Sequence, residues 1–146
     1  LQGYYKVKNP EKYIGRKAPY ARSSWEMAFM RFCDNRPDVI RWSSEGLKIP
    51  YRHPFTNQYT NYVPDFLIEY IDKNGKKHVE LIEIKPSTQS TMETARSRAD
   101  QQAVAINAAK WTAAQEWCAR KGIKFKVITE DQIFRKPAKR KTRKRK

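Results

Sequence analysis

Two apolar stretches lie at the centre of this sequence, Pro64-Asp65-Phe66-Leu67-Ile68-Glu69-Tyr70-Ile71 and Val79-Glu80-Leu81-Ile82-Glu83-Ile84-Lys85-Pro86. Both are rich in the β-branched and aromatic residues that favour strands, and the Asn74-Gly75 pair between them is a turn signal. Pro86 ends the second stretch, because proline has no amide hydrogen for the next hydrogen bond of a ladder. The two stretches therefore predict a β-hairpin with strands at residues 65–71 and 79–85.

The side chains select one register for this hairpin. A two-residue turn would place Asp65 opposite Ile84, whereas a three-residue loop with Gly75 in the left-handed conformation would place Asp65 opposite Glu83. The second register separates apolar from charged residues, and the first mixes them. In the second register, one face carries Phe66, Ile68, Ile82 and Ile84, and the other carries Asp65, Glu83 and Lys85. We therefore predict a bulged hairpin with two carboxylates and a lysine at one end.

The rest of the sequence predicts two helices and further strands around the hairpin. Ser23-Ser24 opens a helical pattern that ends by Pro37, and a long helix runs from about Glu93 or Arg98 to Arg120, closed by Gly122. Short strands are expected at 39–42, 47–51 and 125–129, a polar loop at 52–61, and a short helical turn at 130–134. This order predicts an α/β domain with one mixed sheet and helices packed on it.

The charge of the chain is strongly positive and unevenly placed. Its 146 residues carry 31 Lys and Arg against 15 Asp and Glu, a formal charge of +16. Residues 135–146 hold nine of the basic residues and no acid, which leaves a charge of +7 for residues 1–134. We therefore expect a basic N-terminal arm at 1–22, a folded domain at 23–134 and a disordered basic tail at 135–146.

This charge favours nucleic acid as the partner, because each phosphate that a Lys or Arg neutralises releases counterions and adds sequence-independent affinity. A tail that only aids solubility is the alternative. An anionic membrane surface fits less well, because no amphipathic helix adjoins the tail. No apolar run approaches the roughly 20 residues that a transmembrane helix needs, so we expect no membrane partner.

The predicted meeting of Asp65 and Glu83 has two chemical interpretations. Two close carboxylates repel each other unless a cation lies between them, and Mg²⁺ prefers such hard oxygen ligands. A metal-bound water is a nucleophile near neutral pH, and Lys85 would position that water or offset developing negative charge. The alternative is a cross-strand salt bridge among the three side chains. The spacing of the residues does not choose between these interpretations.

Pro64-Asp65 followed by Glu83-Ile84-Lys85 resembles the PD-(D/E)xK nuclease motif. Further stretches, within roughly residues 20–130, are similar to the head-completion nucleases of T-even-type tailed phages and, more distantly, to TnsA-type transposon endonucleases. These stretches are Arg22-Ser23-Ser24-Trp25-Glu26, Phe29-Met30, Cys33, Trp42-Ser43-Ser44-Glu45, Ile49-Pro50-Tyr51 and Asn107-x-x-Lys110-Trp111.

The resemblance implies a restriction-endonuclease-like core, with the order helix, three strands, helix, strand, and Mg²⁺-dependent cleavage of phosphodiester bonds in double-stranded DNA, with Mn²⁺ as a substitute. It implies metal ligation by Asp65, Glu83 and Ile84, a catalytic role for Lys85, and a further catalytic acid, Glu26, on the first helix. It also implies processing of DNA at phage head completion after packaging. The protein would then act in the host cytoplasm during assembly or in the virion, with portal, neck or head-completion proteins as partners.

Two other functions stay open. One is a non-catalytic DNA-binding protein of the phage head or neck, and the other is a TnsA-like endonuclease subunit of a transposase. Both keep DNA as the partner. We expect DNA contacts from Arg22 and Lys110 and from the tail residues Lys139, Arg140, Lys141, Arg143, Lys144 and Arg145.

Several of these residues have simpler interpretations. Ser23-x-x-Glu26 is a capping box, in which the glutamate stabilises the start of the helix. The segment 87–97, rich in Ser and Thr, is either a connection or a loop that clamps the substrate. The tyrosines of the N-terminal arm either stack on bases or dock the arm against a partner protein. They are Tyr4, Tyr5, Tyr13 and Tyr20.

Overall fold

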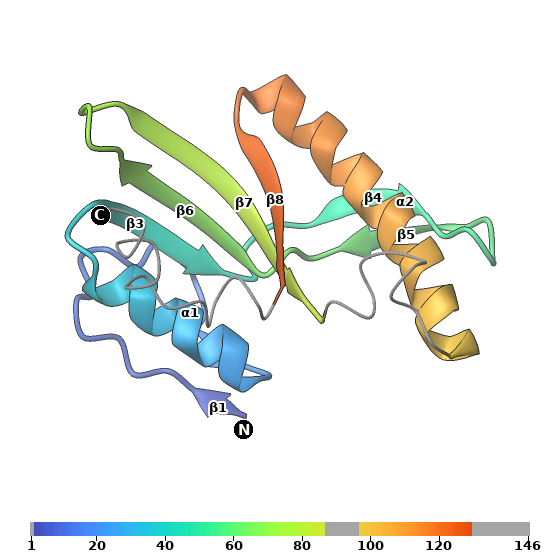
Figure 1. Cartoon of the computed structure of the whole chain (residues 1–146), viewed down its shortest axis with the longest axis horizontal. Helices are drawn as coiled ribbons and strands as arrows, with labels where there is room; N and C mark the ends of the chain where they lie inside the picture. The colour runs from blue at the N-terminus through green and yellow to red at the C-terminus, as the bar shows by residue number, and fades with distance from the viewer. Residues whose placement is uncertain (1, 87–96, 130–146) are drawn as a thin grey trace, which may run out of the picture.

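The computed structural model of the chain describes residues 2–86 and 97–129. Figure 1 shows a twisted sheet with one helix on each side. The elements are β1 (Gly3–Tyr4), β2 (Tyr20–Ala21), α1 (Ser24–Asn35), β3 (Val39–Ser44), β4 (Ile49–Arg52), β5 (Tyr59–Tyr62), β6 (Phe66–Ile71), β7 (Lys77–Lys85), α2 (Arg98–Lys121) and β8 (Lys124–Thr129).

The central sheet has the strand order β3-β6-β7-β8. Its first three strands are antiparallel, whereas β8 runs parallel to β7 after the crossover through α2. The sequence order of this core is therefore α1, then β3, β6 and β7, then α2 and β8. The predicted mixed α/β core of helix, three strands, helix and strand is confirmed.

The hairpin of β6 and β7 has the predicted register. Phe66 pairs with Ile82 and Ile71 pairs with Lys77, an alignment that continues to Asp65 opposite Glu83. The loop at residues 73–75 has Gly75 at φ +82°, and the amide of Gly75 donates to the carbonyl of Asp72 at 2.9 Å. This left-handed position is one that glycine adopts without steric cost. The predicted three-residue loop and bulged hairpin are confirmed.

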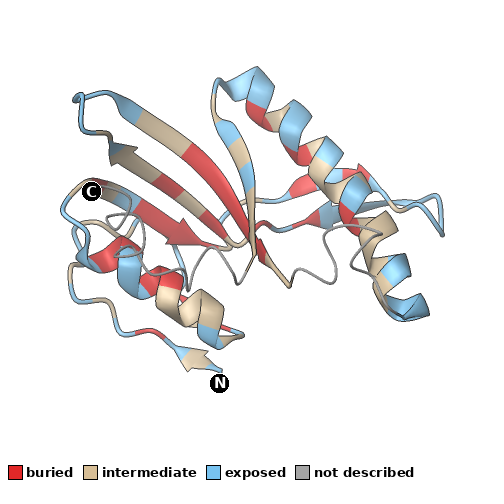
Figure 2. Ribbon diagram, viewed as in Figure 1, coloured by how far each residue is buried: buried red, intermediate tan, exposed pale blue. Residues whose placement is uncertain are grey.

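Each face of the sheet packs against a different set of elements, as the buried segments in Figure 2 show. On one face, Phe66, Ile68, Ile82 and Ile84 belong to a buried cluster with α1 and Trp42 of β3. On the other, Leu81 packs against α2 and the β4–β5 pair, through Ala114, Cys118, Ile49, Tyr51 and Tyr62. Because Glu83 and Lys85 alternate with the first set, they face the second layer.

The two helices begin and end at the signals expected from the sequence. The hydroxyl of Ser23 caps α1, and α2 starts at Arg98 behind its cap Ser97 and ends at Gly122, with φ 71°. The other expected start, Glu93, lies outside the described residues, as do most of segment 87–97, the predicted turn at 130–134 and the tail at 135–146. Neither helix is both long and apolar enough to cross a membrane, within the residues that the structure describes.

The polar loop expected at 52–61 is wrong over its second half. Residues 59–62 form β5, which pairs with β4 from Ile49 opposite Tyr62 to Arg52 opposite Tyr59. The first three residues of β5 are exposed and Tyr62 is buried, so this strand lacks the apolar alternation by which strands are recognised. Its partner β4 begins two residues later than the strand that we expected at 47–51.

Residues 2–22, expected as a basic arm, contain two short strands and pack against α1 and β3. Tyr5 and Ala21 are buried in the cluster of α1. Backbone bonds join Ile14 and Lys12 to Trp42 of β3, at 2.9 and 3.0 Å, so this segment covers the outer edge of the sheet.

Asp34, near the end of α1, anchors this segment. Its carboxylate is buried and accepts from the Tyr5 hydroxyl at 2.6 Å and from the amides of Lys8 and Asn9 at 2.8 and 3.1 Å. Burial opposes the charge, but the hydrogen bonds, first that of Tyr5, outweigh it and hold the pKa of Asp34 below its ordinary value.

We predict that Asp34→Ala lowers the free energy of unfolding by about 2 kcal/mol or more, because four donors, the side-chain amide of Asn9 included, lose a charged acceptor inside the protein. Urea denaturation followed by tryptophan fluorescence measures this. Asp38→Ala is the matched control, since Asp38 forms an exposed ion pair with Arg36 at 3.0 Å, worth less than about 1 kcal/mol. Equal losses in the two variants would contradict the anchoring role of Asp34.

Candidate functional site

The predicted acid pair lies where β6 begins and β7 ends. Asp65 follows the buried Pro64 and directly precedes β6, and Glu83 and Lys85 lie in the last three residues of β7. The carbonyl of Asp65 accepts from the amide of Glu45 at 2.9 Å, which ties the end of β3 to the same place. Glu83 is buried, while Asp65 and Lys85 are half-buried. The structure therefore brings the three predicted residues together.

Hydrogen bonds fix the two carboxylates. Asp65 Oδ2 accepts from the amide of Ile84 at 2.7 Å, and Glu83 Oε1 accepts from the amide of Asp65 at 3.3 Å. Glu83 Oε1 also accepts from the hydroxyl of Tyr62 at 2.7 Å. Lys85 Nζ lies 3.6 Å from Glu83 Oε2. Each acid is thus held by the backbone of the opposite strand.

The acids carry charge that the lysine does not fully offset. Burial, and next the charge of Glu83, raise the pKa of Asp65 well above its ordinary value. Burial also raises the pKa of Glu83, against the hydrogen bond from Tyr62 and the charge of Lys85. An ordinary salt bridge would lower both pKa values, because a nearby cation favours the ionised form. Lys85 does act in this direction on both acids, but its effect is smaller than that of burial.

Glu26 lies at the start of α1. Its amide donates to Ser23 Oγ at 3.1 Å, so Ser23 caps the helix as expected, whereas Glu26 Oε1 accepts at 3.0 Å from the amide of Arg22, one residue before the cap, and supports the helix start from there. Burial raises the pKa of Glu26, and its charge contributes to the raised pKa of Asp65. The carboxylate is therefore within electrostatic reach of the acid pair while it supports the helix start.

Helix α2 brings Lys110 to the same site. Its Nζ lies 5.6 Å from the centroid of the Tyr62 ring and 6.0 Å from that of Tyr51. Burial, and next the charge of Lys85, lower the pKa of Lys110, while Glu83 and Asp65 act in the opposite direction. Two lysines therefore face the acid pair from different elements. Arg22 lies elsewhere, with its guanidinium 3.2 Å from Glu45, and the tail residues expected to contact DNA lie outside the described residues.

The described residues fit a divalent cation that retains most of its water. No group of three or more His, Cys, Asp or Glu within the described ranges could hold a metal, so the site offers two carboxylates. Mg²⁺ commonly binds through one or two carboxylates and completes its octahedron with water and substrate oxygens. The side chain of Ile84, the third residue that the resemblance implies as a metal ligand, packs on the opposite face, and its amide holds Asp65.

Tyr62 is the residue of this site that the sequence did not predict. It is buried, donates to Glu83, and its own pKa is raised, first by burial and then by the charge of Glu83. The signal was weak, because Tyr62 ends a strand whose other residues are exposed. We regard Tyr62 as a positioning residue, since it fixes the orientation of Glu83 rather than the substrate.

Comparison with known proteins gives two matches. A family described as TnsA-like endonuclease N terminal matches residues 36–130, a range that includes Asp65, Glu83 and Lys85 and follows Glu26. The head completion nuclease of Enterobacteria phage T4 is 33% identical over 143 residues, which cover 90% of this chain and 92% of that protein. Because the family match spans more than half of the chain and the phage protein is similar over nearly its whole length, this chain belongs to the family of TnsA-like endonuclease N-terminal domains.

Proposed function

We propose that this member of a nuclease family is a Mg²⁺-dependent deoxyribonuclease, which hydrolyses phosphodiester bonds of double-stranded DNA at Asp65, Glu83 and Lys85. One observation supports this most strongly: a protein of charge +16 keeps two acids of raised pKa together beside a lysine. A protein that merely holds DNA would gain nothing from a pocket that repels phosphate. The non-catalytic alternative leaves this arrangement without a purpose.

The roles of the residues follow from their positions. Asp65, Glu83 and the carbonyl of Ile84 would hold the cation, and Mn²⁺ would substitute for Mg²⁺. When bound, Mg²⁺ supplies a Lewis acid that lowers the pKa of water and offsets charge on the phosphate. Lys85 would position the attacking water or stabilise the charge that develops on the phosphoryl oxygens. Tyr62 and the amide of Ile84 keep the two acids in place throughout.

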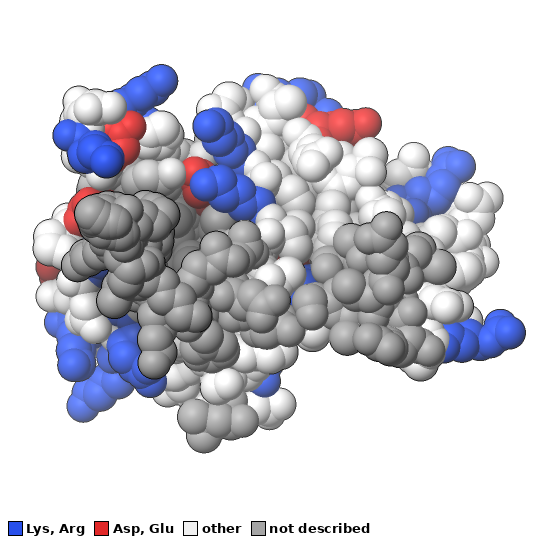
Figure 3. All heavy atoms as spheres, viewed as in Figure 1, with Lys and Arg blue, Asp and Glu red and all other residues white. Residues whose placement is uncertain are grey.

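Affinity for DNA would come from contacts with phosphates. Figure 3 shows one face of the molecule, on which Lys and Arg side chains lie in several places and Asp and Glu in fewer. Lys110 would approach the backbone near the cleaved bond, and Arg22 and the tail would contact it further away. Contacts of this kind position a protein on the duplex without reading its bases, so we expect low sequence specificity.

We propose that the cleavage serves phage head completion after DNA packaging, in the host cytoplasm or in the virion, with portal, neck or head-completion proteins as partners. The similarity over 92% of the T4 head completion nuclease supports this process. A TnsA-like subunit of a transposase is the second candidate, which the family match at residues 36–130 favours. Co-purification with a transposase of the DDE type would favour the second candidate.

We predict that the full chain cuts plasmid DNA with Mg²⁺ and that Asp65→Ala lowers the rate by at least about 100-fold, because one cation ligand is lost. EDTA should abolish the cleavage. Gel assays of nicked and linear DNA measure both effects, and Asp38→Ala, an exchange of an exposed acid just before β3, serves as the control. Binding without cleavage under every condition would leave the non-catalytic DNA-binding protein as the function.

We predict different outcomes for two exchanges at the start of α1. Glu26→Gln keeps an oxygen that accepts from Arg22 but removes the charge near Asp65, so cleavage should fall at least tenfold while stability changes little. Ser23→Ala removes the cap and leaves the carboxylate, so it should cost about 1 kcal/mol of stability and retain cleavage. Thermal unfolding and plasmid cleavage of both variants measure this. Full activity of Glu26→Gln would mean that Glu26 only supports the helix start.

We predict that Asp65→Asn stabilises the protein in EDTA, increasingly as the pH rises from about 4 to 8. Because the pKa of Asp65 is raised in the folded state, its contribution to stability is present at low pH and is lost as the pH passes the folded pKa. Each pKa unit of the rise adds about 1.4 kcal/mol to the difference. Urea denaturation at several pH values measures this, and Mg²⁺ should reverse the difference at pH 8.

The control for this experiment is Asp38→Asn. Its ion pair with Arg36 lowers the pKa of Asp38, so here the wild-type protein should gain stability relative to the variant as the pH rises. If Asp65→Asn follows the same trend as Asp38→Asn, the pKa of Asp65 is not raised in the folded protein.

A further inference from the structure

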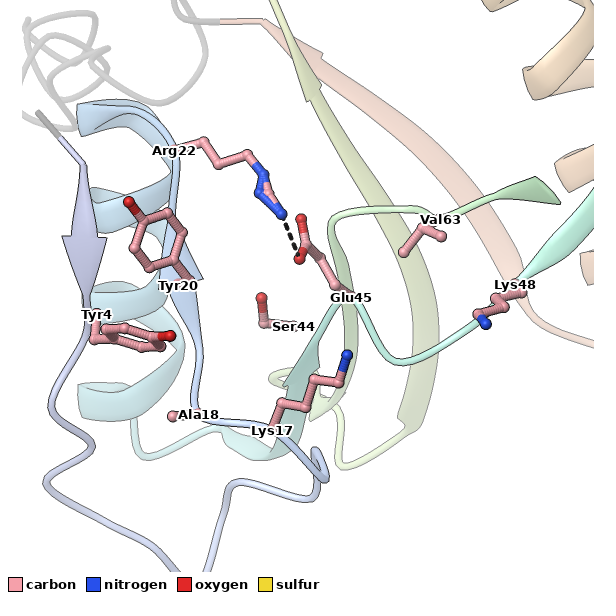
Figure 4. A pocket seen from close by; sticks show the side chains of 9 residues that line it. All are labelled: Tyr4, Lys17, Ala18, Tyr20, Arg22, Ser44, Glu45, Lys48 and Val63. Atoms are coloured by element: carbon pink, nitrogen blue, oxygen red, sulfur yellow. Dashed lines mark hydrogen bonds and ion pairs between the residues drawn. The ribbon is translucent and has the colours of Figure 1, made fainter.

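A basic groove lies beside the acid pair, and Figure 4 shows the side chains that line it. Its main part has a volume of about 780 Å³ and is lined by Lys17, Arg22 and Lys48 together with Tyr4 and Tyr20. An adjoining pocket of about 500 Å³ shares Lys17 and Lys48 and adds Arg16. We call the two together the basic groove. Pockets of about 300–1,000 Å³ hold ligands of the size of a nucleotide or two.

The charge of the basic groove suits a polyanion. Its four cationic side chains, Arg16, Lys17, Arg22 and Lys48, are all exposed. Glu45 is the acid among the described residues that line it, and Glu45 is paired with Arg22 at 3.2 Å. The groove therefore keeps excess positive charge in a concave part of the surface, which is where phosphates would gain most from contact.

Two tyrosines form an aromatic platform in the groove. The rings of Tyr4 and Tyr20 meet edge to face with their centroids 4.9 Å apart, and the Arg22 guanidinium lies 5.8 Å from the Tyr20 ring. Tyr4 is 72% exposed, although an aromatic side chain normally buries its surface. Antiparallel pairing of β1 with β2 places the two residues opposite each other, and Tyr5, bound to Asp34, fixes the strand beside them. The platform is thus held ready in the free protein.

The other tyrosines of the N-terminal segment serve the fold. The hydroxyl of Tyr5 is bound to Asp34 inside the protein. The ring of Tyr13 packs against Trp42, with centroids 4.7 Å apart, and its hydroxyl donates to the carbonyl of Lys17. Of the four tyrosines near the N-terminus, Tyr4 and Tyr20 are therefore the two that face the groove.

Backbone contacts link the groove to the acid pair, although Asp65, Glu83 and Lys85 do not themselves line it. The amide of Glu45, in the groove, donates to the carbonyl of Asp65 at 2.9 Å, and Val63 lines the groove two residues before Asp65. The amide of Arg22 donates to Glu26 at 3.0 Å. A strand of DNA that leaves the acid pair in this direction would enter the groove.

We propose that the basic groove binds a single-stranded segment of DNA, such as an overhang or a flap, that adjoins the cleaved bond. An unpaired base would stack on the exposed ring of Tyr4, which the ring of Tyr20 supports edge to face, and the adjoining phosphates would contact Lys17, Arg22 and Lys48. Bases in the interior of a duplex stack on one another and cannot offer their faces to a tyrosine, whereas a basic groove with aromatic rings is typical of sites for single strands. The proposal rests on DNA being the substrate, and it adds the structure of the preferred DNA.

Binding is tested first without cleavage, on the full chain in EDTA. Fluorescence anisotropy with a labelled oligonucleotide of ten thymidines measures the affinity of the wild-type protein, Tyr4→Ala, Tyr20→Ala and Lys17→Glu. We expect each exchange to weaken binding at least about fivefold, the lower end of the effect of losing one stacked base. Tyr59→Ala is the control for the tyrosines, because Tyr59 is 70% exposed and also has an arginine over its ring, Arg52 at 5.1 Å. Lys76→Glu, in the exposed turn of the hairpin, is the control for Lys17→Glu.

Contact between DNA and the platform is tested by photo-cross-linking. An oligonucleotide that carries 5-iododeoxyuridine should cross-link to Tyr4 or Tyr20, as located by mass spectrometry of the digested protein. Cross-links at Tyr59 alone, or equal loss of affinity in the groove and control variants, would overturn the proposal. Tyr4→Ala keeps the test decisive if Tyr20→Ala fails to fold, because the ring of Tyr4 is largely outside the protein.

Cleavage then separates this inference from the proposed function. With Mg²⁺, the wild-type protein should cut a duplex with a single-stranded overhang faster than the same duplex with blunt ends, and Tyr4→Ala should lower that ratio. If the wild type and Tyr4→Ala both cut the two duplexes at one rate, the proposal that the groove binds a single strand is overturned and the proposed nuclease activity stands. If the groove binds and cross-links the oligonucleotide but neither duplex is cut, single-strand binding by the groove is supported and the proposed nuclease activity is overturned.

Discussion

The left-handed turn at Gly75 sets which residues of β6 and β7 face each other, and the rest of the structure depends on that register. With three residues in the loop, Asp65 lies level with Glu83, and the apolar residues of both strands fall on the face that α1 covers. A loop one residue shorter would turn Asp65 toward that apolar face and separate it from Glu83. A single backbone conformation at the far end of the hairpin thus fixes both the core and the acid pair.

The structure holds its acid pair at a cost in stability. Both acids lie among buried groups, and their pKa values are raised because the ionised forms are poorly solvated there. What keeps them in position is a set of donors: the amides of Asp65 and Ile84, the hydroxyl of Tyr62 and the ammonium of Lys85. The covering layer of α2 and the β4–β5 pair contributes the hydroxyl of Tyr62. That layer is therefore part of the site as well as part of the core.

The central elements of this fold could be predicted from the sequence, and the outer strands and the N-terminal segment could not. The hairpin, both helices and the last strand were predictable because apolar periodicity, caps and a turn residue agreed at each of them. Strand β5 was not, because it is mostly exposed and depends on β4 for its hydrogen bonds. Because β5 was not predicted, the position of Tyr62 at its end was not predicted either. The packing of residues 2–22 was equally hidden, since it depends on one buried acid, Asp34, whose donors are distant in the sequence.

Residues 2–22 are fastened chiefly to α1 and β3, through Asp34 and the backbone of Trp42, although Tyr5 and Ala21 also share a buried cluster with residues of β6 and β7. Regions of a protein that are fastened independently can open independently, at a lower free energy than global unfolding. Release of Tyr5 from Asp34 would dissolve the Tyr4–Tyr20 platform while β6 and β7 stay paired. If the two proposals hold, capture of a DNA end and hydrolysis would have separate stabilities, and substitutions in the N-terminal segment would alter the choice of substrate more than the chemistry.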